Sequence, residues 1–294
     1  MKLTTFYKIY FRHRFEKAKT FLKMYLLFSL IIRYLMNLLY FEKKIDLDKL
    51  SQKNSFLENK NLHQLFEFFN SDKGFYFIDQ YPEPFKRRNN NNKIKAHGYS
   101  PFYENYFKDI KNQKINILEL GSFYGNASAA LYFYFKNAKI FGADINPDMF
   151  KYYSNRVENI YVDSGSRESI IRNVYNKKIS FKIIIEDASH MLKDQILSLF
   201  ILFKAVDPGG IFIIEEIDFP EKRVDMRKNQ NPPDLKQILY KIKANENFNS
   251  EYINSGEKEY FLNHFESINF YKGNFNEVAI ITKKSKDSKI FGQN

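Results

Sequence analysis

The 294-residue chain contains no cysteine. This absence excludes disulfide bonds, thiolate zinc sites and cysteine nucleophiles, and it fits a reducing compartment. Any bound metal ion must therefore use oxygen or imidazole ligands. The sequence also lacks internal repeats, and no small-residue cleavage motif follows its longest apolar run, so a cleaved signal peptide fits poorly. Apolar residues make up 44% of the chain, which is enough for a sizeable folded core.

Positive charge is unevenly distributed along the chain, which has a formal net charge of +12. About half of the excess lies before residue 24, and a second basic cluster in the C-terminal tail contains Lys283, Lys284, Lys286 and Lys289. A basic end beside an apolar segment suits an anionic membrane surface at least as well as it suits nucleic acid. Nucleic acid is therefore not the partner that we expect first.

The most apolar run covers residues 21–41 and is interrupted by two basic residues. On a helix its polar positions fall within an arc of roughly 120°, although Leu26 and Leu30 share that arc. Three arrangements stay open for this run: an interfacial membrane helix, a helix packed on its own domain or on a partner subunit in a homo-oligomer, and a membrane span. We predict that residues 1–44 form a basic amphipathic N-terminal helix on a protein that is cytoplasmic or peripheral at the inner face of the membrane.

Residues 45–112 are predicted to form a helical cap and lid. Apolar residues recur at helical spacings over residues 45–70 and again over residues 99–110. Between them, residues 79–98 contain two prolines and a run of four asparagines, which predicts a mobile surface loop.

Residues 113–283 alternate short β-branched runs with helical stretches, which is typical of a Rossmann-like, doubly wound α/β fold with a mostly parallel sheet. The predicted strands are 115–120, 139–143, 160–162, 181–186 and 210–215, separated by helices at 127–135, 167–175 and 193–204. Two further runs, 267–271 and 278–282, predict an antiparallel edge hairpin. Residues 284–294 form a basic tail.

The first predicted strand leads into a glycine-rich turn, within ILELGSFYGNAS. Gly121 and Gly125 allow a tight strand-to-helix turn and a close approach of a ligand to the backbone, and Glu119 stands just before that turn. The second strand, KIFGAD, ends in Asp144, where a carboxylate can accept hydrogen bonds from both ribose hydroxyls. The loop alone could be a plain strand-to-helix turn. Together, the loop, the acid and the distance of about twenty residues between them favour a nucleoside site.

The residue pattern of this loop helps to distinguish a dinucleotide cofactor, such as NAD, from a cofactor with a single nucleoside. A dinucleotide-binding turn normally reads G-x-G-x-x-G, whereas this one reads E-x-G-x-x-x-G. That pattern resembles motif I of class I S-adenosylmethionine (SAM)-dependent methyltransferases, which implies SAM as the cofactor, Asp144 as the ribose ligand and Asp163 as the group near the adenine amine. Asp163 has an alternative role as the N-cap of the helix that starts at residue 167. The expected cofactor-binding residues are Glu119, Gly121, Ser122, Gly125, Asp144 and Asp163.

Acidic residues end the fourth and fifth predicted strands. Asp187 ends the fourth within FKIIIEDASH, His190 follows it, and Glu215 and Glu216 end the fifth. Adjacent strand ends bring these groups together, although only one of two consecutive strand side chains faces a given side. Clustered carboxylates repel one another, and a hard divalent cation, most simply magnesium, would neutralise them. In the alternative, one glutamate caps the following loop and His190 caps the next helix.

The pair EDASH and IIEEI resembles the D-x-S-H and I-E-[DE] motifs of metal-dependent sugar O-methyltransferases that act on macrolide antibiotics and related glycosides. SDKG at residues 71–74 and HGYSPFYENYF at residues 97–107 resemble the segment that closes over SAM in that group, and the resemblance covers residues 71–282. The sequence departs from the group at Glu216, where Asp is more usual, and at Ala188, which replaces Gly. The implied metal ligands are Asp187, Glu215 and Glu216.

The resemblance implies a SAM-dependent O-methyltransferase whose acceptor is a sugar or glycoconjugate hydroxyl. Magnesium would lower the pKa of that hydroxyl, His190 would be the general base, and Asp187 would share the catalytic site. Two alternatives stay open: a methyltransferase of RNA or protein, and a non-catalytic, SAM-binding, membrane-associated scaffold. Among the other aromatic and histidine residues, we expect Tyr99, Tyr103 and Tyr124 to be pocket walls, and we expect His97 to lie in the presumed lid.

Overall fold

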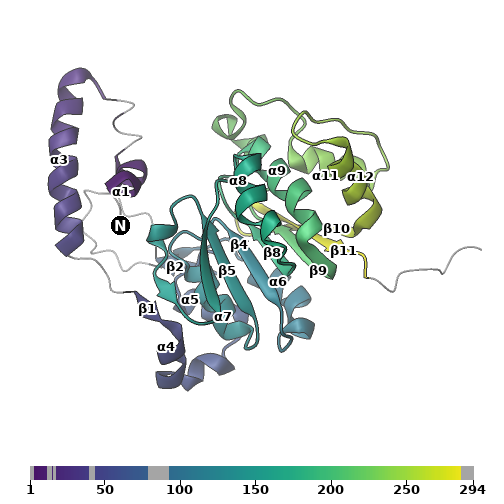
Figure 1. The fold of residues 1–294 in the computed structure, drawn as a ribbon, viewed down its shortest axis with the longest axis horizontal. Coiled ribbons are helices and arrows are strands. Elements are labelled where there is room, and N and C mark those ends of the chain that lie inside the picture. The colour runs from purple at the N-terminus through teal and green to yellow at the C-terminus, as the bar shows by residue number, and fades with distance from the viewer. Residues whose placement is uncertain (1–2, 12–14, 16–17, 40–43, 79–92, 286–294) are drawn as a thin grey trace, which may run out of the picture.

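The computed structural model describes residues 3–11, 15, 18–39, 44–78 and 93–285 (Figure 1). At its centre lies a seven-stranded sheet, as the sequence predicts. Its strands are β4 (Asn116–Leu120), β5 (Lys139–Asp144), β7 (Val157–Tyr161), β8 (Phe181–Glu186), β9 (Val206–Ile214), β10 (Phe265–Lys272) and β11 (Glu277–Lys283).

The strand order is β10-β11-β9-β8-β4-β5-β7. Neighbours run parallel from β9 to β7, whereas β11 pairs antiparallel with both β9 and β10. The predicted parallel sheet with an antiparallel edge hairpin is therefore confirmed. From β4 the chain proceeds outward to β5 and β7 and then returns to β8 on the other side of β4. Open α/β sheets bind ligands at the carboxyl ends of strands beside such a reversal.

Helices cover both faces of the sheet (Figure 1). One face packs against α8 (Arg167–Asn173), α9 (Leu192–Leu202), α11 (Leu235–Lys243) and α12 (Ser255–His264). The other packs against α4 (Leu47–Lys53), α5 (Leu62–Phe68), α6 (Ser100–Phe107) and α7 (Asn126–Tyr134). Leu118 and Ile184 belong to the first apolar cluster, and their neighbours Ile117 and Ile183 belong to the second. Because these strands are buried on both faces, they are continuously apolar.

Shorter elements complete the fold. β1 (Ile45–Asp46) pairs in parallel with β6 (Tyr152–Tyr153), and β2 (Tyr76–Ile78) pairs antiparallel with β3 (Lys93–Lys95). The surface loop predicted at residues 79–98 therefore contains a paired strand, β3, near its end. Its residues 79–92 lie outside the described residues. The remaining elements are α10 (Phe219–Lys222), η1 (Ser55–Asn59), η2 (Lys108–Ile110), η3 (Pro147–Met149), η4 (Tyr175–Lys177), η5 (Phe203–Ala205) and η6 (Val224–Arg227).

Two strand boundaries differ from the prediction by three residues or more. The third predicted strand starts at Val157 instead of residue 160, because β7 is an edge strand whose second and third residues, Glu158 and Asn159, are polar and not buried. The fifth starts at Val206, before Pro208-Gly209-Gly210. Its pairing with β8 is irregular there, so the Pro-Gly-Gly segment is a bulge within the strand instead of the turn before it.

The N-terminal segment contains two described helices, α1 (Leu3–Tyr10) and α3 (Thr20–Leu39), so the prediction of a single helix is wrong. Leu26 and Leu30, which interrupted the predicted polar arc, are buried in a small cluster with Phe6 and Phe11. The polar side of α3 therefore faces the preceding segment. Both helices lie apart from the sheet in Figure 1. In the described part of the chain, no helix combines the length and apolarity that a membrane span requires.

The predicted basic tail is only partly described. Lys283 is buried, and its Nζ donates hydrogen bonds to the carbonyl oxygens of Phe203 (3.2 Å) and Val206 (2.6 Å), so this residue is no part of an exposed basic surface. Lys286 and Lys289 lie outside the described residues. The division of the chain into segments 1–44, 45–112, 113–283 and 284–294 stays a prediction.

Candidate active site

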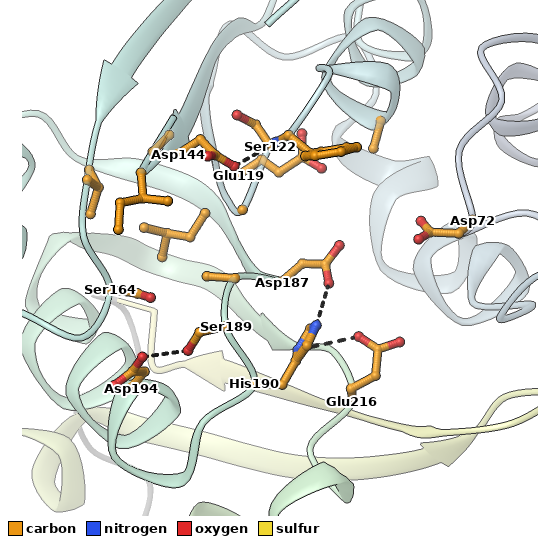
Figure 2. Close-up of a pocket in the computed structure, with 18 of the residues that line it drawn as sticks. Asp72, Glu119, Ser122, Asp144, Ser164, Asp187, Ser189, His190, Asp194 and Glu216 are labelled. Atoms are coloured by element: carbon orange, nitrogen blue, oxygen red, sulfur yellow. Dashed lines mark hydrogen bonds and ion pairs between the residues drawn. The ribbon is translucent and has the colours of Figure 1, made fainter. Parts of the chain in front are cut away.

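A cavity of about 580 Å³ opens at the carboxyl ends of the central strands (Figure 2). It lies where the strand order reverses, which is the position expected for a ligand site in this fold. Eight of the predicted site residues line it: Glu119, Gly121, Ser122, Asp144, Asp163, Asp187, His190 and Glu216. Gly125 and Glu215 are not among the lining residues.

The two loop glycines are required by the packing of the turn itself. Gly121 and Gly125 have φ angles of 84° and 80°, which favour glycine. A Cβ atom at Gly121 would lie 1.8 Å from the carbonyl oxygen of Asp187, and one at Gly125 would lie 2.7 Å from the ring of Phe150. These glycines therefore allow a close approach of the chain to itself, and the predicted close approach of a ligand stays a prediction.

Asp144 is held in place by the backbone beneath the cavity. Its carboxylate accepts hydrogen bonds from the N–H groups of Phe123 (2.9 Å) and Asn146 (2.7 Å), and burial raises its pKa. Each carboxylate oxygen can accept more than one hydrogen bond, so capacity remains for two ribose hydroxyls.

Asp163 also lines the cavity, and it does not cap the following helix. Its side chain accepts the N–H of Gly165 at 3.0 Å, whereas Ser166 is the N-cap of α8 and accepts the N–H of Ser169. The alternative reading of Asp163 as the N-cap is wrong, and its predicted role beside an adenine stays open.

Glu119 and Ser122 form the floor next to the glycine turn. The Ser128 hydroxyl donates to Glu119, and burial raises the pKa of Glu119 to about 7. The buried Oγ of Ser122 has no hydrogen-bond partner among the described residues. An unpaired buried hydroxyl is costly, and a polar ligand in this cavity would satisfy it.

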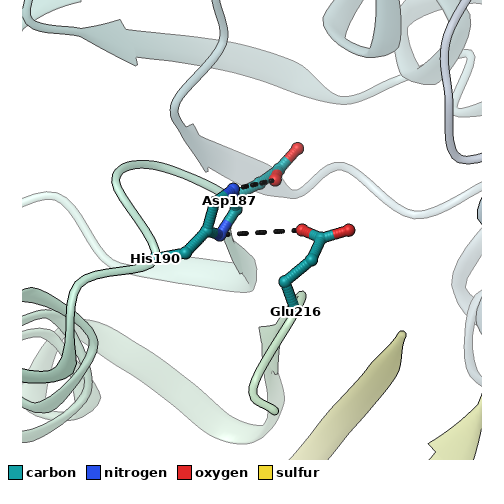
Figure 3. A group of neighbouring side chains, drawn as sticks. All are labelled: Asp187, His190 and Glu216. Atoms are coloured by element: carbon teal, nitrogen blue, oxygen red, sulfur yellow. Dashed lines mark ion pairs between the residues drawn. The ribbon is translucent and has the colours of Figure 1, made fainter. Parts of the chain in front are cut away.

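Asp187, His190 and Glu216 converge at the other end of the cavity (Figure 3). Each offers one ligand atom, and these atoms lie within 4.8 Å of one another. His190 Nε2 lies 3.7 Å from Asp187 Oδ1, and His190 Nδ1 lies 3.6 Å from Glu216 Oε2. His190 and Glu216 have φ angles of 56° and 46°, which are unfavourable for these residue types. Such strain is tolerated most often where a side chain must be aimed at a functional site.

Glu215 extends in a different direction from Glu216. Its Oε1 lies 2.8 Å from Lys73 Nζ and accepts a hydrogen bond from the Tyr103 hydroxyl, while its buried Oε2 has no partner among the described residues. Burial and then the charge of Asp187 raise the pKa of both glutamates well above the usual range. A divalent cation fits this cluster of buried carboxylates, because it would favour their charged forms.

His190 does not cap the next helix, because Met191 occupies the N-cap of α9. The imidazole packs edge-on against Phe219, and its Nδ1 has no hydrogen-bond partner in the described structure. Burial lowers the pKa of His190 below its usual 6.5, so a neutral imidazole is available near pH 7.

The sequence interpretation missed three residues of the site. Lys73 lies between Asp187, Glu215 and Glu119, and although burial lowers its pKa, Asp187 and Glu215 hold it well above the usual value. His97 Nδ1 lies 3.1 Å from Glu216 Oε1, and Asp194 accepts the Ser189 hydroxyl at 2.5 Å on the cavity wall. Lys73 and His97 lie in the two N-terminal motifs, SDKG and HGYSPFYENYF, which were the available signal.

Only one of the three predicted pocket-wall tyrosines has that role. Tyr124 lines the cavity. Tyr99 and Tyr103 are completely buried and do not line it, and their hydroxyls donate to Glu216 (3.3 Å) and Glu215. These two residues hold the acidic pair by hydrogen bonds from the protein interior, so the prediction that they are pocket walls is wrong.

Part of the chain is similar in sequence to sugar O-methyltransferases. One relative is 8-demethyl-8-(2-methoxy-alpha-L-rhamnosyl)-tetracenomycin-C 3'-O-methyltransferase of Streptomyces olivaceus, with 30% sequence identity. The match covers 41% of this chain and 32% of that enzyme. The same shares of both chains match mycinamicin VI 2''-O-methyltransferase of Micromonospora griseorubida, again at 30% identity. This chain therefore spans about a third of the length of the curated relatives that it matches. No protein-family model matches it.

A solved methyltransferase has the same architecture. MycE of the mycinamycin biosynthetic pathway, in complex with Mg, SAH and mycinamycin VI, superimposes with a TM-score of 0.58 over 80% of this chain and 57% of its own, at 20% identity. The chain has a class I methyltransferase fold. The likeness to MycE rests on the fold, and the local sequence match adds a resemblance to enzymes that methylate sugars.

Proposed function

We propose that the protein is a SAM-dependent O-methyltransferase that acts on a hydroxyl of a sugar or glycoconjugate. The observation that carries the proposal is the cavity that Asp144 and the glycine turn line at one end and Asp187, His190 and Glu216 line at the other (Figure 2). The sugar O-methyltransferases among the relatives support the reaction class.

SAM is proposed to bind along the ends of β4 and β5. Asp144 accepts hydrogen bonds from the ribose hydroxyls, Asp163 lies at the adenine end, and Ser122 donates its free hydroxyl to the amino-acid end. Glu119 faces the same end, where a carboxylate can interact with the amino group of the cofactor. Gly121 and Gly125 shape the turn that supports these contacts.

The proposed magnesium ligands are Asp187, Glu215 and Glu216. Asp187 and Glu216 already converge, and Glu215, which does not line the cavity, would have to turn its unpaired Oε2 toward them to join the oxygen set. Bound there, magnesium supplies charge stabilisation to an acceptor oxygen and lowers the pKa of the hydroxyl. The hard carboxylate ligands favour magnesium over softer metals.

His190 is proposed to take the proton of the acceptor hydroxyl. Its neutral imidazole lies beside Asp187 and Glu216, which stabilise the imidazolium after proton transfer. The oxygen then attacks the methyl group in line with the departing sulfur, so the rate depends on how closely the walls of the cavity align the two substrates.

Calorimetry with SAM and with NAD, each with and without magnesium, tests the cofactor assignment. We expect SAM to bind with a Kd of about 1–100 μM and NAD to give no heat, because the turn lacks the dinucleotide pattern. Methyl transfer from labelled SAM to rhamnosylated macrolide or polyketide acceptors should then require magnesium. Methyl transfer to RNA or protein instead would contradict the proposal and favour a methyltransferase of those acceptors. SAM binding without any metal-dependent turnover would favour a non-catalytic, SAM-binding scaffold.

We further propose that α3 binds an anionic membrane surface. Ten large apolar side chains of this helix are exposed, and on a helical wheel they span roughly 220° without a charged residue. A helix packed on a core needs a stripe of about 100°, so this face is wider than a protein contact requires. The exposed residues are Phe21, Leu22, Met24, Tyr25, Leu27, Phe28, Ile31, Ile32, Leu35 and Met36.

The charge of this segment also favours an anionic bilayer. Residues 1–44 contain ten Lys or Arg residues and two Glu, so they carry eight of the twelve net positive charges. Basic side chains near an apolar helix face attract anionic lipids by about 1 kcal/mol each. The alternative in which α3 joins two subunits, and the cytoplasmic or inner-membrane location, stay predictions.

Flotation of the full chain with lipid vesicles tests the membrane proposal. We expect binding to vesicles that contain phosphatidylglycerol, little binding to pure phosphatidylcholine, and loss of binding in Phe28→Glu. Val224→Glu is the matched control, because Val224 is equally exposed, at 69% against 68%, but lies in η6. A dimer that Phe28→Glu dissociates, with no vesicle binding by the wild type, would show that α3 is a subunit contact.

A further inference from the structure

Lys73 is one of the most deeply buried charged side chains of the protein, with 1% of its surface exposed. Its backbone is fixed where the cap meets the core. The carbonyl oxygen of Lys73 accepts the N–H groups of Tyr99 (3.0 Å) and Ser100 (3.1 Å), and its own N–H donates to the Ser71 hydroxyl. The side chain is therefore directed into the core from a segment that precedes the sheet in sequence.

The ammonium group reaches acids at the ends of three strands. It forms an ion pair with Asp187 after β8, lies 2.8 Å from Glu215 Oε1 after β9, and lies 3.9 Å from Glu119 Oε1 in β4. Glu119 belongs to the SAM end of the cavity, whereas the other two belong to the proposed metal end. One cation thus contacts both halves of the site.

Asp187 also contacts the backbone at the start of the glycine-rich turn, residues 121–125, which we call the SAM loop. Its N–H donates to the carbonyl oxygen of Leu120 at 2.9 Å, and its own carbonyl oxygen lies so close to Gly121 that no Cβ atom fits between them. A movement of Asp187 would therefore displace the turn that shapes the cofactor site. Buried carboxylates that lose their cationic partner either move apart or become protonated.

We propose that Lys73 is an internal counter-ion that holds Asp187 and the SAM loop in position whether or not a divalent cation is bound. This inference rests on the proposed function, because it assigns the two ends of the cavity to SAM and to a metal ion. Lys73 is then a positioning residue: it contacts the ligand-binding acids, and it allows SAM to bind before the metal.

The first test measures stability without metal. In EDTA we expect Lys73→Met to lower the Tm by about 5–10 °C, since removing one partner of a buried ion pair leaves uncompensated charge. The double variant Lys73→Met with Glu215→Gln should recover at least half of that loss, because it removes charge from both partners. Lys283→Met is the matched control: Lys283 is also buried, but its Nζ contacts backbone carbonyls.

The second test measures the affinity for S-adenosylhomocysteine by calorimetry, with and without magnesium. In the wild type we expect the two Kd values to agree within about threefold. In Lys73→Met we expect binding in EDTA to weaken by about tenfold and magnesium to restore it, because the metal then supplies the missing charge. The Lys283→Met control should retain the wild-type pattern, since loss of a buried lysine alone does not alter the charge of the site.

The outcomes distinguish a failure of the proposed methyltransferase function from a failure of the inference about Lys73. If the protein binds no SAM-type ligand, the proposed function fails, and the stability comparison in EDTA still decides whether Lys73 is the counter-ion. If the ligand binds but Lys73→Met matches Lys283→Met in stability, or if magnesium changes its affinity no more than in the wild type, the inference about Lys73 is overturned and the proposed function stands.

Discussion

Replacing His190 with alanine is expected to slow methyl transfer by about 10²–10⁴-fold while leaving SAM affinity unchanged. The imidazole lies between Asp187 and Glu216 at the end of the cavity opposite the proposed ribose ligand, so its removal takes away the proton acceptor without touching the nucleoside contacts. Single-turnover rates with labelled SAM, together with calorimetry, would measure the two quantities separately.

The matched control for His190→Ala is His264→Ala. His264 ends α12, where its Nδ1 lies 2.7 Å from the Tyr260 carbonyl oxygen, and it does not line the cavity. Turnover should survive that change. Wild-type turnover in His190→Ala would refute the assignment of the base. Loss of SAM binding in the same variant would place His190 in the cofactor site instead.

The pH dependence of the wild type follows from the same residue. A base acts in its deprotonated form, and burial lowers the pKa of His190 below 6.5. The neutral imidazole therefore persists to lower pH than in an exposed histidine, and turnover should decline only below pH 6.5. A decline that is centred well above this pH would mean that another group controls the rate.

The central sheet was predictable from the sequence because its strands are buried on both faces. Runs such as FKIIIE have no polar alternation and stand out from the helices around them, and β8 has the predicted bounds. The edge strand β7 was harder, since the polar residues Glu158 and Asn159 interrupt its apolar run. The packing of the segment around α1 against α3 depends on contacts among Phe6, Phe11, Leu26 and Leu30, which no local pattern encodes.

The acidic site was predictable only in part. Parallel strand ends must meet at one edge, which placed Asp187, His190 and Glu216 together. The directions of the two consecutive glutamates were not accessible, because they depend on the left-handed backbone of Glu216 and on the tyrosines beneath it. Lys73 contacts Asp187 across 114 positions of sequence, and no periodicity links such distant residues.

Asp187→Asn is the second change with a large expected effect. We expect turnover to fall by about 10³-fold or more and magnesium to stop stimulating it, because metal-assisted stabilisation of the acceptor oxygen contributes several kcal/mol. The amide keeps the shape of the side chain but removes the charge that both the cation and Lys73 require. Asp109→Asn, an exposed aspartate in η2, is the control for the chemical change itself.

Magnesium titration of this variant distinguishes a metal ligand from a purely structural acid. If Asp187 binds the metal, isothermal titration should show weaker magnesium binding, and saturating magnesium should not restore turnover. If Asp187 serves only to pair with Lys73, magnesium binding through Glu215 and Glu216 should persist near the wild-type Kd and only the Tm should fall. The second outcome would mean that Asp187 is not a metal ligand, although the fold stays intact. His190 would then act as the general base without a metal-bound neighbour.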